Sequence, residues 1–451
     1  MRISAQLGRE ISIREIFMNP SIATLAKALQ DFSPGADRVS NHSYYPSFYR
    51  RRKYSNYSSH VSVRIPRLEQ LIERGTIAPL DAAAITYLPS SWIAHRRLSN
   101  GDLLSHFPQH KPMLTNIYES SVGRIGVFVI GMFDNELYRN QEETVAYVTE
   151  AVLCAQTFGA RAIALTGLIP SATDYGIKVA EITSKQNRIA VTTGHAATAS
   201  AMILTISQAL HISGRDLQRE KVCFLGLGSI GLSTLKLMLS CLPHPKVLTL
   251  CDVYHKGDAI EKLRGQLHSE FGYKGQINVL QSGVEVPREV YRASIIIGAT
   301  NVPDLLDVAR LEGGTIVVDD SHPHCFPVGA ALRRLRGSQD VLFTEGGLLR
   351  SPQVISETRY WSRWLASMVR PREATERDPA EIMGCMISAG LCSSQVGLDA
   401  SIGPVDLETC MLYYRAIDRI GFSAAQLQCH GYIIPQRITV EFRRRFGHHQ
   451  S

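Results

Sequence analysis

KVCFLGLGSIGLSTLKLML, residues 221–239, is the stretch that decides the fold of this chain. The apolar run Lys221–Leu225 predicts a β-strand, and the residues after the glycines repeat with the 3.6-residue period of a helix. Between strand and helix, residues 226–231 match the pattern G-x-G-x-x-G. This combination is typical of a βαβ unit whose first turn binds the pyrophosphate of a dinucleotide.

The residue types in this turn fit that role physically. Gly226 permits the tight bend, Gly228 leaves room for a pyrophosphate against the backbone, and Gly231 lets the helix pack closely on the strand. Ser229 and Ile230 begin the helix, where unpaired N–H groups and the helix dipole attract an anion. The sequence therefore predicts a dinucleotide site at these five residues.

A second apolar strand, residues 246–252, ends in an acid that bears on the choice of cofactor. Asp252 follows Gly231 by 21 residues, the distance at which a carboxylate holds a ribose hydroxyl of NADH. A carboxylate repels the additional phosphate of NADPH, but His255 and Lys256 are close enough in sequence to bind that phosphate. NADH and NADPH both remain candidates.

Two further predicted strands carry polar residues at their carboxyl ends. Residues 292–301 end in GATN, whose Ala299 and Thr300 we expect beside the nicotinamide ribose. Residues 313–324 read GGTIVVDDSHPH and predict the next strand. Ligands of open α/β sheets bind outside the carboxyl ends of the strands, so these residues belong to the candidate site.

An α/β pattern also precedes the glycine turn. Residues 123–132 predict a strand, 140–160 an amphipathic helix and 161–168 a second strand, which together form a βαβ unit. We therefore expect an α/β, two-domain dehydrogenase fold. Its predicted parts are a substrate-binding α/β domain at 61–215, a Rossmann NAD(P)-binding domain at 216–360 and a C-terminal helical region at 361–451, with helices at 380–391 and 405–420.

The composition excludes several classes of protein. The 451 residues are 45% hydrophobic and 20% charged, which rules out disordered and fibrous chains. The net charge of +7, from 48 Lys and Arg against 41 Asp and Glu, is small for this length, and we expect no nucleic-acid partner. Residues 189–214 carry no charged side chain but are too polar to span a bilayer, so they predict a buried helix.

The cysteines and the first residues suggest a compartment. The nine cysteines include no C-x-x-C pair and have mostly apolar neighbours, as expected of reduced thiols. A charged amphipathic stretch follows Met1, where a secretory signal would have an apolar run. We expect a cytoplasmic protein.

Residues 1–32 resemble the C-terminal half of a carrier-protein domain of nonribosomal peptide and polyketide synthases. The resemblance rests on the string GREISIREIFMNPSIATLAKAL, in which a short helix ending in Phe-x-x-Pro-Ser-Ile precedes a terminal helix. The serine that carries the phosphopantetheine arm in that family is absent, so the segment is a remnant; an ordinary helix pair is the alternative. Residues 33–60 predict a linker, and its run Arg50–Lys53 among tyrosines favours a solvated tether over a site for single-stranded nucleic acid.

A second resemblance covers about residues 115–425. The motifs ALTGLIPSAT (164–173), VTTGHAATASA (191–201), GLGSIG, VVDDSHP and EGGLL (345–349), in this order, are similar to those of the cyanobacterial fatty acyl-carrier-protein reductases and their relatives in biosynthetic gene clusters. The resemblance implies a reductase that takes an acyl thioester and NADPH or NADH to an aldehyde. It also implies that an acyl carrier protein or acyl-CoA is the substrate, and synthase modules are candidate partners.

The chain departs from that family at the nucleophile. The resemblance places the cysteine that forms an acyl-enzyme thioester just after residues 346–351, where this chain has Pro352. Either hydride attacks the carrier thioester directly, or another cysteine serves. Cys325 is the candidate, because His322 and His324 are adjacent in sequence, whereas Cys385 lies on the apolar face of a predicted helix and is expected in the core.

Direct reduction requires groups that stabilise an oxyanion and donate a proton. The candidates are His195 and Thr193 at a predicted helix N-terminus, Ser171 on the preceding loop and His322 at a strand end. The cyanobacterial relatives have asparagine at the position of His195, so this residue is not implied by the resemblance. His322-x-His324 has no evident third ligand, and no metal site is predicted.

Three functions are therefore open from the sequence. The first is a thioester reductase that releases an aldehyde. The second is a dehydrogenase of a small hydroxy or amino acid on the same scaffold. The third is a catalytically degenerate module that docks a synthase.

Overall fold

The computed structural model describes residues 58–60, 74–75, 78–90, 104, 107, 111–186, 189–253, 257–283, 285–360 and 378–448. The carrier-protein resemblance at 1–32, most of the predicted linker at 33–60, and His255 and Lys256 lie outside these residues.

Six strands of the described chain form a parallel sheet, called here the Rossmann sheet. They are β7 (Lys221–Leu225), β8 (Val247–Val253), β9 (Gln276–Ser282), β10 (Ile295–Gly298), β11 (Ile316–Asp319) and β12 (Leu342–Glu345). Their order is β12-β11-β10-β7-β8-β9, so the two halves of the sheet meet between β7 and β10. This order is that of a doubly wound dinucleotide-binding sheet, whose ligand lies at the point where the strand order reverses. The predicted α/β class is confirmed.

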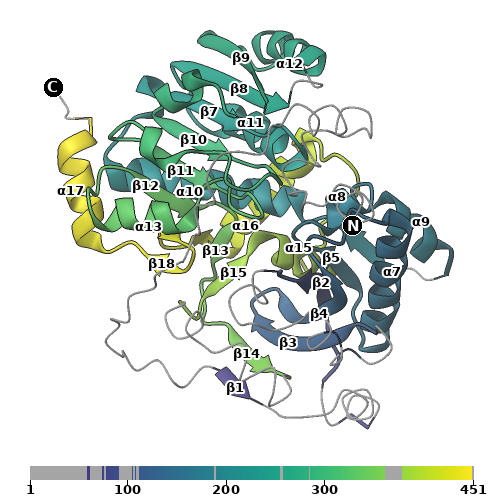
Figure 1. Ribbon diagram of the computed structural model, residues 1–451. Helices are drawn as coiled ribbons and strands as arrows, with labels where there is room; N and C mark the ends of the chain where they lie inside the picture. The colour runs from purple at the N-terminus through teal and green to yellow at the C-terminus, as the bar shows by residue number, and fades with distance from the viewer. Residues whose placement is uncertain are drawn as a thin grey trace, which may run out of the picture.

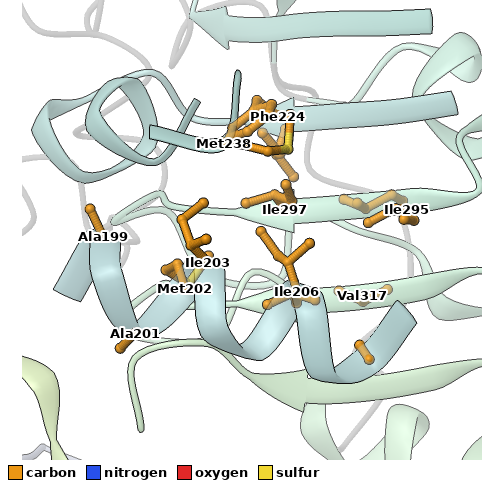
Figure 2. Close-up of a cluster of buried hydrophobic side chains, with 14 of the residues drawn as sticks. Ala199, Ala201, Met202, Ile203, Ile206, Phe224, Met238, Ile295, Ile297 and Val317 are labelled. Carbon is orange, nitrogen blue, oxygen red and sulfur yellow. The ribbon is translucent and has the colours of Figure 1, made fainter. Parts of the chain in front are cut away.

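Helices cover the Rossmann sheet (Figure 1). They include α11 (Ser229–Cys241), α12 (Gly257–Ser269) and α13 (Val328–Arg336), with short 3-10 turns at Leu217–Arg219, Arg288–Arg292 and Val308–Arg310. Helix α10 (His195–Ser213) is the charge-free segment predicted from the sequence. Figure 2 shows Ile203 and Ile206 of α10 directed toward Ile297 and Val317 of the sheet. Since α10 also packs against α11, α15, α16 and α17, nearly its whole circumference is buried, which explains the absence of charged residues.

No helix among the described residues is long and apolar enough to span a membrane.

Seven strands of the described chain form a second, mixed sheet, called here the first sheet. They are β1 (Ser58–His60), β2 (Ala82–Leu88), β3 (Met113–Ser120), β4 (Gly123–Phe133), β5 (Ala162–Leu165), β6 (Ala190–Thr192) and β14 (Ser356–Arg359), in the order β1-β14-β3-β4-β2-β5-β6. The sequence predicted β4 and β5 as one βαβ unit. The structure inserts β2 between them, parallel to both. This strand was missed because it begins with three alanines, which have no preference for strands, so only a short β-branched and aromatic run remains to mark it.

Side chains of β2 alternate between two layers of core. Ala83 and Ile85 pack toward α7 (Gln141–Thr157), whose N-terminus Asn140 caps by accepting a hydrogen bond from the Glu143 backbone. Ala82 and Ala84 face the opposite side, which α15 (Gly384–Ser393) covers. Small residues on β2 allow α15 to approach the sheet closely. Two further helices of this half are α8 (Ile169–Ala172) and α9 (Ile177–Gln186).

The chain after residue 345 differs from the predicted division into domains. β14 pairs with β3 of the first sheet, α15 packs on that sheet, and α16 (Leu407–Ile420) packs on α10 and α11. The remaining elements are β13 (Leu348–Arg350), β15 (Glu381–Met383), β16 (Ser423–Ala424), β17 (Gln428–Cys429), β18 (Tyr432–Ile433) and α17 (Gln436–Phe446). Residues 378–448 are thus distributed over both halves of the molecule, since each half has an apolar face that the preceding chain leaves uncovered.

Candidate functional site

A cavity of about 910 Å³ extends from the carboxyl end of the Rossmann sheet to the face of the first sheet. Its walls come from the loops after β7, β8, β10, β11 and β12, from the N-termini of α10 and α15, and from β2, β3, β4 and β14. Most of the predicted site residues line this cavity: Ser171, Thr193, His195, Gly226, Gly228, Ser229, Ile230, Asp252, Ala299, Thr300 and His322.

The glycine turn is built for a close approach of a ligand. Gly226 has φ +98°, and a Cβ there would lie 2.4 Å from the carbonyl oxygen of Ala299. A Cβ on Gly231 would lie 2.1 Å from the carbonyl oxygen of Gly226, so this residue supports the turn and does not line the cavity. A Cβ on Gly228 would meet nothing within 4 Å. Gly228 therefore leaves open space at the N-terminus of α11, where an anion is stabilised.

Ser229 supplies an independent sign that a ligand belongs there. It is the first residue of α11 and lines the cavity, and its buried Oγ has no hydrogen-bond partner among the described residues. A buried hydroxyl without a partner costs free energy unless a ligand or water satisfies it. The open space at Gly228 and the unpaired Ser229 hydroxyl both fit a pyrophosphate.

Asp252 ends β8 beside the glycine turn. Its Oδ2 accepts a hydrogen bond of 2.7 Å from the backbone N–H of Leu227, and its Oδ1 accepts one of 2.7 Å from Val253. The side chain is 7% exposed and lines the cavity. The carboxylate therefore both supports the turn and faces the space where a ribose would lie.

Ala299 and Thr300 follow β10 at the point where the strand order reverses. The N–H of Ala299 donates to the carbonyl of Leu225, and the N–H of Thr300 donates to Ser321 Oγ at 3.1 Å. These bonds hold the loop against the glycine turn, so its backbone lines the cavity next to Gly226.

His195 begins α10 and is enclosed by the cavity wall. The imidazole is 6% exposed, and burial lowers its pKa to about 4, so the ring is neutral at physiological pH. Its Nδ1 is buried without a hydrogen-bond partner in the described part of the chain. A neutral ring with an unpaired nitrogen is suited to hydrogen bonding with a ligand, and it is a weak proton donor.

Thr193 and Ser171 have structural partners as well as cavity positions. The Oγ1 of Thr193 accepts from the N–H of His195 at 3.4 Å and donates to the carbonyl of Ser401 at 3.4 Å. The Oγ of Ser171 lies 2.5 Å from the hydroxyl of Tyr138, which also hydrogen-bonds Asn301 of the loop after β10. Tyr138 thereby links Ser171 to the loop after β10 of the Rossmann sheet.

His322 lies on the cavity wall against Tyr87. The two ring centroids are 5.9 Å apart in an edge-to-face arrangement. Enclosure lowers the pKa of His322, with the Asp134 carboxylate acting in the opposite direction. The predicted cavity position of His322 agrees with the structure.

Three acidic side chains lie together at the carboxyl ends of β11 and β12. Asp319 Oδ2 is 2.9 Å from Nδ1 of His324, while Asp320 and Glu345 line the cavity next to this pair. Burial, together with the neighbouring Asp319 and Glu345 carboxylates, raises the pKa of Asp320 to about 8. Among the residues described, no three His, Cys, Asp or Glu side chains are arranged to hold a metal ion.

The raised pKa of Asp320 predicts how stability depends on pH. The unfolded carboxyl ionises near 3.8, but the folded one keeps its proton to about pH 8, so the free energy of unfolding falls as pH rises between these values. Asparagine removes this titration. We expect the Tm of Asp320→Asn, relative to wild type, to be about 3 °C higher at pH 8 than at pH 5.

Thermal unfolding at several pH values measures this difference. Asp418→Asn, on the exposed side of α16, is the matched control and should give a constant difference from wild type. The same constant result for Asp320→Asn would contradict a buried, protonated carboxyl.

The structure reverses the positions predicted for Cys325 and Cys385. Cys325 is 0% exposed and does not line the cavity, and burial together with Asp319 raises its pKa far above the ordinary value. These properties correct its candidacy as a nucleophile to a packing role. Pro352 also lies away from the cavity, near Gly421.

Cys385, which the sequence placed in the core, lies on the cavity wall instead. It is the single cysteine among all nine that lines the cavity, and it occupies the first turn of α15. A Cβ on Gly194 would be 2.7 Å from Cys385 Cα, so the N-termini of α10 and α15 touch at this point. The helical periodicity of the sequence could not reveal this position of Cys385, because the first turn of a buried helix can face a cavity.

The surroundings of the Cys385 thiol shift its pKa in two opposite directions. Burial, with a contribution from the Asp320 carboxylate, raises its pKa to about 12, so the resting group is a thiol. The backbone N–H groups of Gly167, Met386 and Cys385 itself act in the opposite direction. Negative charge that develops on the sulfur or beside it therefore meets hydrogen-bond donors.

Of three comparisons with known proteins, the one with solved structures found matches. No family model matches the chain, and no curated protein matches it. Among solved structures, the chain is similar to L-tryptophan dehydrogenase from Nostoc punctiforme, with 14% identity over 81% of this chain and 86% of that chain and a TM-score of 0.36. It is similar to a glutamate dehydrogenase, with 13% identity over 82% and 79% and a TM-score of 0.34. It is also similar to malic enzyme from Pyrococcus horikoshii, with 16% identity over 84% and 85% and a TM-score of 0.31. These likenesses are distant.

Proposed function

We propose that this protein is a nicotinamide-dependent oxidoreductase that reduces an acyl thioester to an aldehyde through Cys385. The observation that carries the proposal is that one thiol and one dinucleotide-type glycine turn line the same cavity. Bound at the glycine turn, NADH or NADPH supplies a hydride. Gly228 and Ser229 would hold its pyrophosphate, Asp252 its adenosine ribose, and Ala299 and Thr300 the nicotinamide ribose.

The first half of the reaction transfers the acyl group to the protein. The Cys385 sulfur attacks the thioester carbonyl, the new C–S bond forms, and the carrier thiolate leaves. We assign the ionised form of Asp320, a minority at neutral pH because its pKa is about 8, as the group that accepts the thiol proton and returns it to the departing carrier. A carboxyl whose pKa is about 8, and whose charge is felt at the thiol, is suited to exchange a proton near neutral pH.

The second half releases the aldehyde. Addition of hydride to the acyl carbon gives the anion of a thiohemiacetal on Cys385. As the C–S bond breaks, the negatively charged oxygen becomes the aldehyde carbonyl and the Cys385 thiolate leaves. The Cys385 thiolate takes up one proton from solvent through Asp320, which balances the hydride consumed. The neutral His195 ring, with its unpaired Nδ1, orients the acyl group or the nicotinamide amide by a hydrogen bond.

The proposed substrate carrier is an acyl carrier protein or coenzyme A. Residues on the first-sheet side of the cavity include Met113, Val127, Val129 and Ile355, which offer an apolar surface for an acyl chain. The likeness of residues 1–32 to a carrier-protein remnant supports a role beside a nonribosomal peptide or polyketide synthase.

Asp252 supports NADH as the preferred cofactor, because its buried carboxylate would repel a phosphate on the neighbouring ribose. We expect wild type to have the higher kcat/KM with NADH. Asp252→Asn, which removes the charge and keeps one of the two oxygens that accept backbone hydrogen bonds, should shift the ratio of kcat/KM values toward NADPH by about tenfold.

Steady-state rates with each cofactor measure this ratio. Asp258→Asn, at the exposed start of α12, is the control and should leave it unchanged. An unaltered cofactor ratio in Asp252→Asn would mean that this carboxylate does not select the cofactor.

The function is tested by mixing the protein with acyl-loaded carrier protein or acyl-CoA and adding NADH or NADPH. We expect loss of absorbance at 340 nm with release of an aldehyde, identified by mass spectrometry. Turnover of a free hydroxy or amino acid without any thioester turnover would replace the proposal with a small-substrate dehydrogenase. Absence of cofactor binding would indicate a docking module.

A further inference from the structure

Tyr87 occupies an irregular position on a strand whose other residues are regularly paired. It is the sixth residue of β2, and the register of β2 against β4 shifts between Thr86 and Leu88, on either side of it. Register irregularities in sheets re-aim a side chain and are frequent beside active sites. The Tyr87 ring is 4% exposed, and it lines the cavity.

The hydroxyl of Tyr87 accepts a hydrogen bond but donates none to the described residues. It accepts a hydrogen bond of 3.2 Å from the backbone N–H of Leu168, and its own proton has no acceptor among the residues that the structure describes. Burial raises the pKa of Tyr87, so the hydroxyl keeps this proton throughout the physiological range. A buried O–H donor that lines a cavity and lacks an acceptor is arranged to meet a ligand oxygen.

Gly167 connects this hydroxyl to the nucleophile. A Cβ on Gly167 would lie 2.6 Å from the Tyr87 oxygen, and the N–H of the same residue acts on the Cys385 thiol. Tyr87 and Cys385 therefore both lie beside Gly167, whose φ of +59° favours glycine at this position. The carbonyl oxygen of an acyl group on Cys385 has the Tyr87 hydroxyl within the same small region of the cavity.

We propose that Tyr87 donates the hydrogen bond that stabilises the oxyanion formed at the carbonyl carbon of the acyl group on Cys385. The proposal rests on the proposed function and adds a catalytic residue to it. The hydroxyl holds the carbonyl oxygen of the thioester before attack, and it holds the negatively charged oxygen after hydride has added. No proton is transferred from Tyr87, so the balance of protons described for Asp320 is unchanged.

Tyr87→Phe tests the proposal, because it removes the hydroxyl and keeps the ring. We expect kcat to fall about 100-fold, the usual loss when one oxyanion donor is removed, while the Kd for NADH stays within about twofold. Tyr273→Phe is the control: Tyr273 is buried in the Rossmann half, its hydroxyl donates to the Pro245 carbonyl, and it does not line the cavity. This control should retain wild-type kcat.

A trifluoromethyl ketone analogue of the substrate supplies a readout that a purely structural role of Tyr87 would not change. It adds to the Cys385 thiol and carries an ionisable hydroxyl on the tetrahedral carbon, whose ionisation ¹⁹F NMR follows. We expect this hydroxyl to titrate at least one pH unit higher in Tyr87→Phe than in wild type.

The outcomes separate the two proposals. Adducts that form in both proteins and titrate at the same pH overturn the role of Tyr87 and leave the thioester reductase intact. Absence of any adduct at Cys385 in wild type overturns the proposed function itself. Wild-type kcat in Tyr87→Phe also overturns the oxyanion role.

Discussion

Cys385→Ser is expected to lower the rate of aldehyde formation by at least about 10³-fold, because a serine hydroxyl in this site is a far weaker nucleophile and leaving group than a thiol. The variant should bind NADH normally, since Cys385 lies on α15 and the glycine turn that would hold the cofactor precedes α11. Intact-protein mass spectrometry after incubation with a thioester should find an acyl adduct on wild type and none on the variant.

Cys154→Ser is the matched control for this substitution. Cys154 is a partly exposed thiol on α7 and does not line the cavity, so its replacement should leave both the acyl adduct and the turnover unchanged. Aldehyde formation at the wild-type rate in Cys385→Ser would instead mean that hydride attacks the carrier-bound thioester directly.

Gly228→Asp is expected to weaken cofactor binding by at least about 100-fold, or close to 3 kcal/mol. The added carboxylate would occupy the space reserved for the pyrophosphate and repel its charge. The fold should tolerate it, because Gly228 has φ −71°, its Cβ position is empty, and aspartate is a favourable residue at a helix N-cap. Titration of NADH fluorescence and thermal unfolding measure the two effects separately.

Gly231→Ala is the contrasting variant. Its Cβ would lie 2.1 Å from the backbone oxygen of Gly226, so the turn must shift, and a loss of stability should accompany any loss of binding.

Normal cofactor affinity in Gly228→Asp would show that the pyrophosphate site lies elsewhere.

The sequence was sufficient where structure depends on neighbours along the chain. The strand at 221–225, the turn at 226–231 and the helix after it follow from local periodicity and from glycines that only a close backbone approach requires. The charge-free helix was likewise predictable, because a helix that is apolar around its circumference is stable only when buried on every side.

The alanine-rich β2 and the position of Cys385 were not predictable in this way. Alanine has no preference for strands, and β2 forms because its small side chains fit between the α7 layer and the α15 layer. A cysteine among apolar residues has the same local pattern whether it faces a core or a cavity.

The sequence by itself determined the strand at 221–225, the glycine turn and the helix after it, since these depend on interactions between residues near each other in the chain. Only the tertiary structure decided which side chains share the cavity. It brings α15 and β14 back onto the first sheet, so that Glu357 hydrogen-bonds Asn116 across 241 residues of sequence and Cys385 lies next to Gly194. Such contacts depend on which apolar faces remain uncovered after the local elements have formed, and no local pattern contains that information.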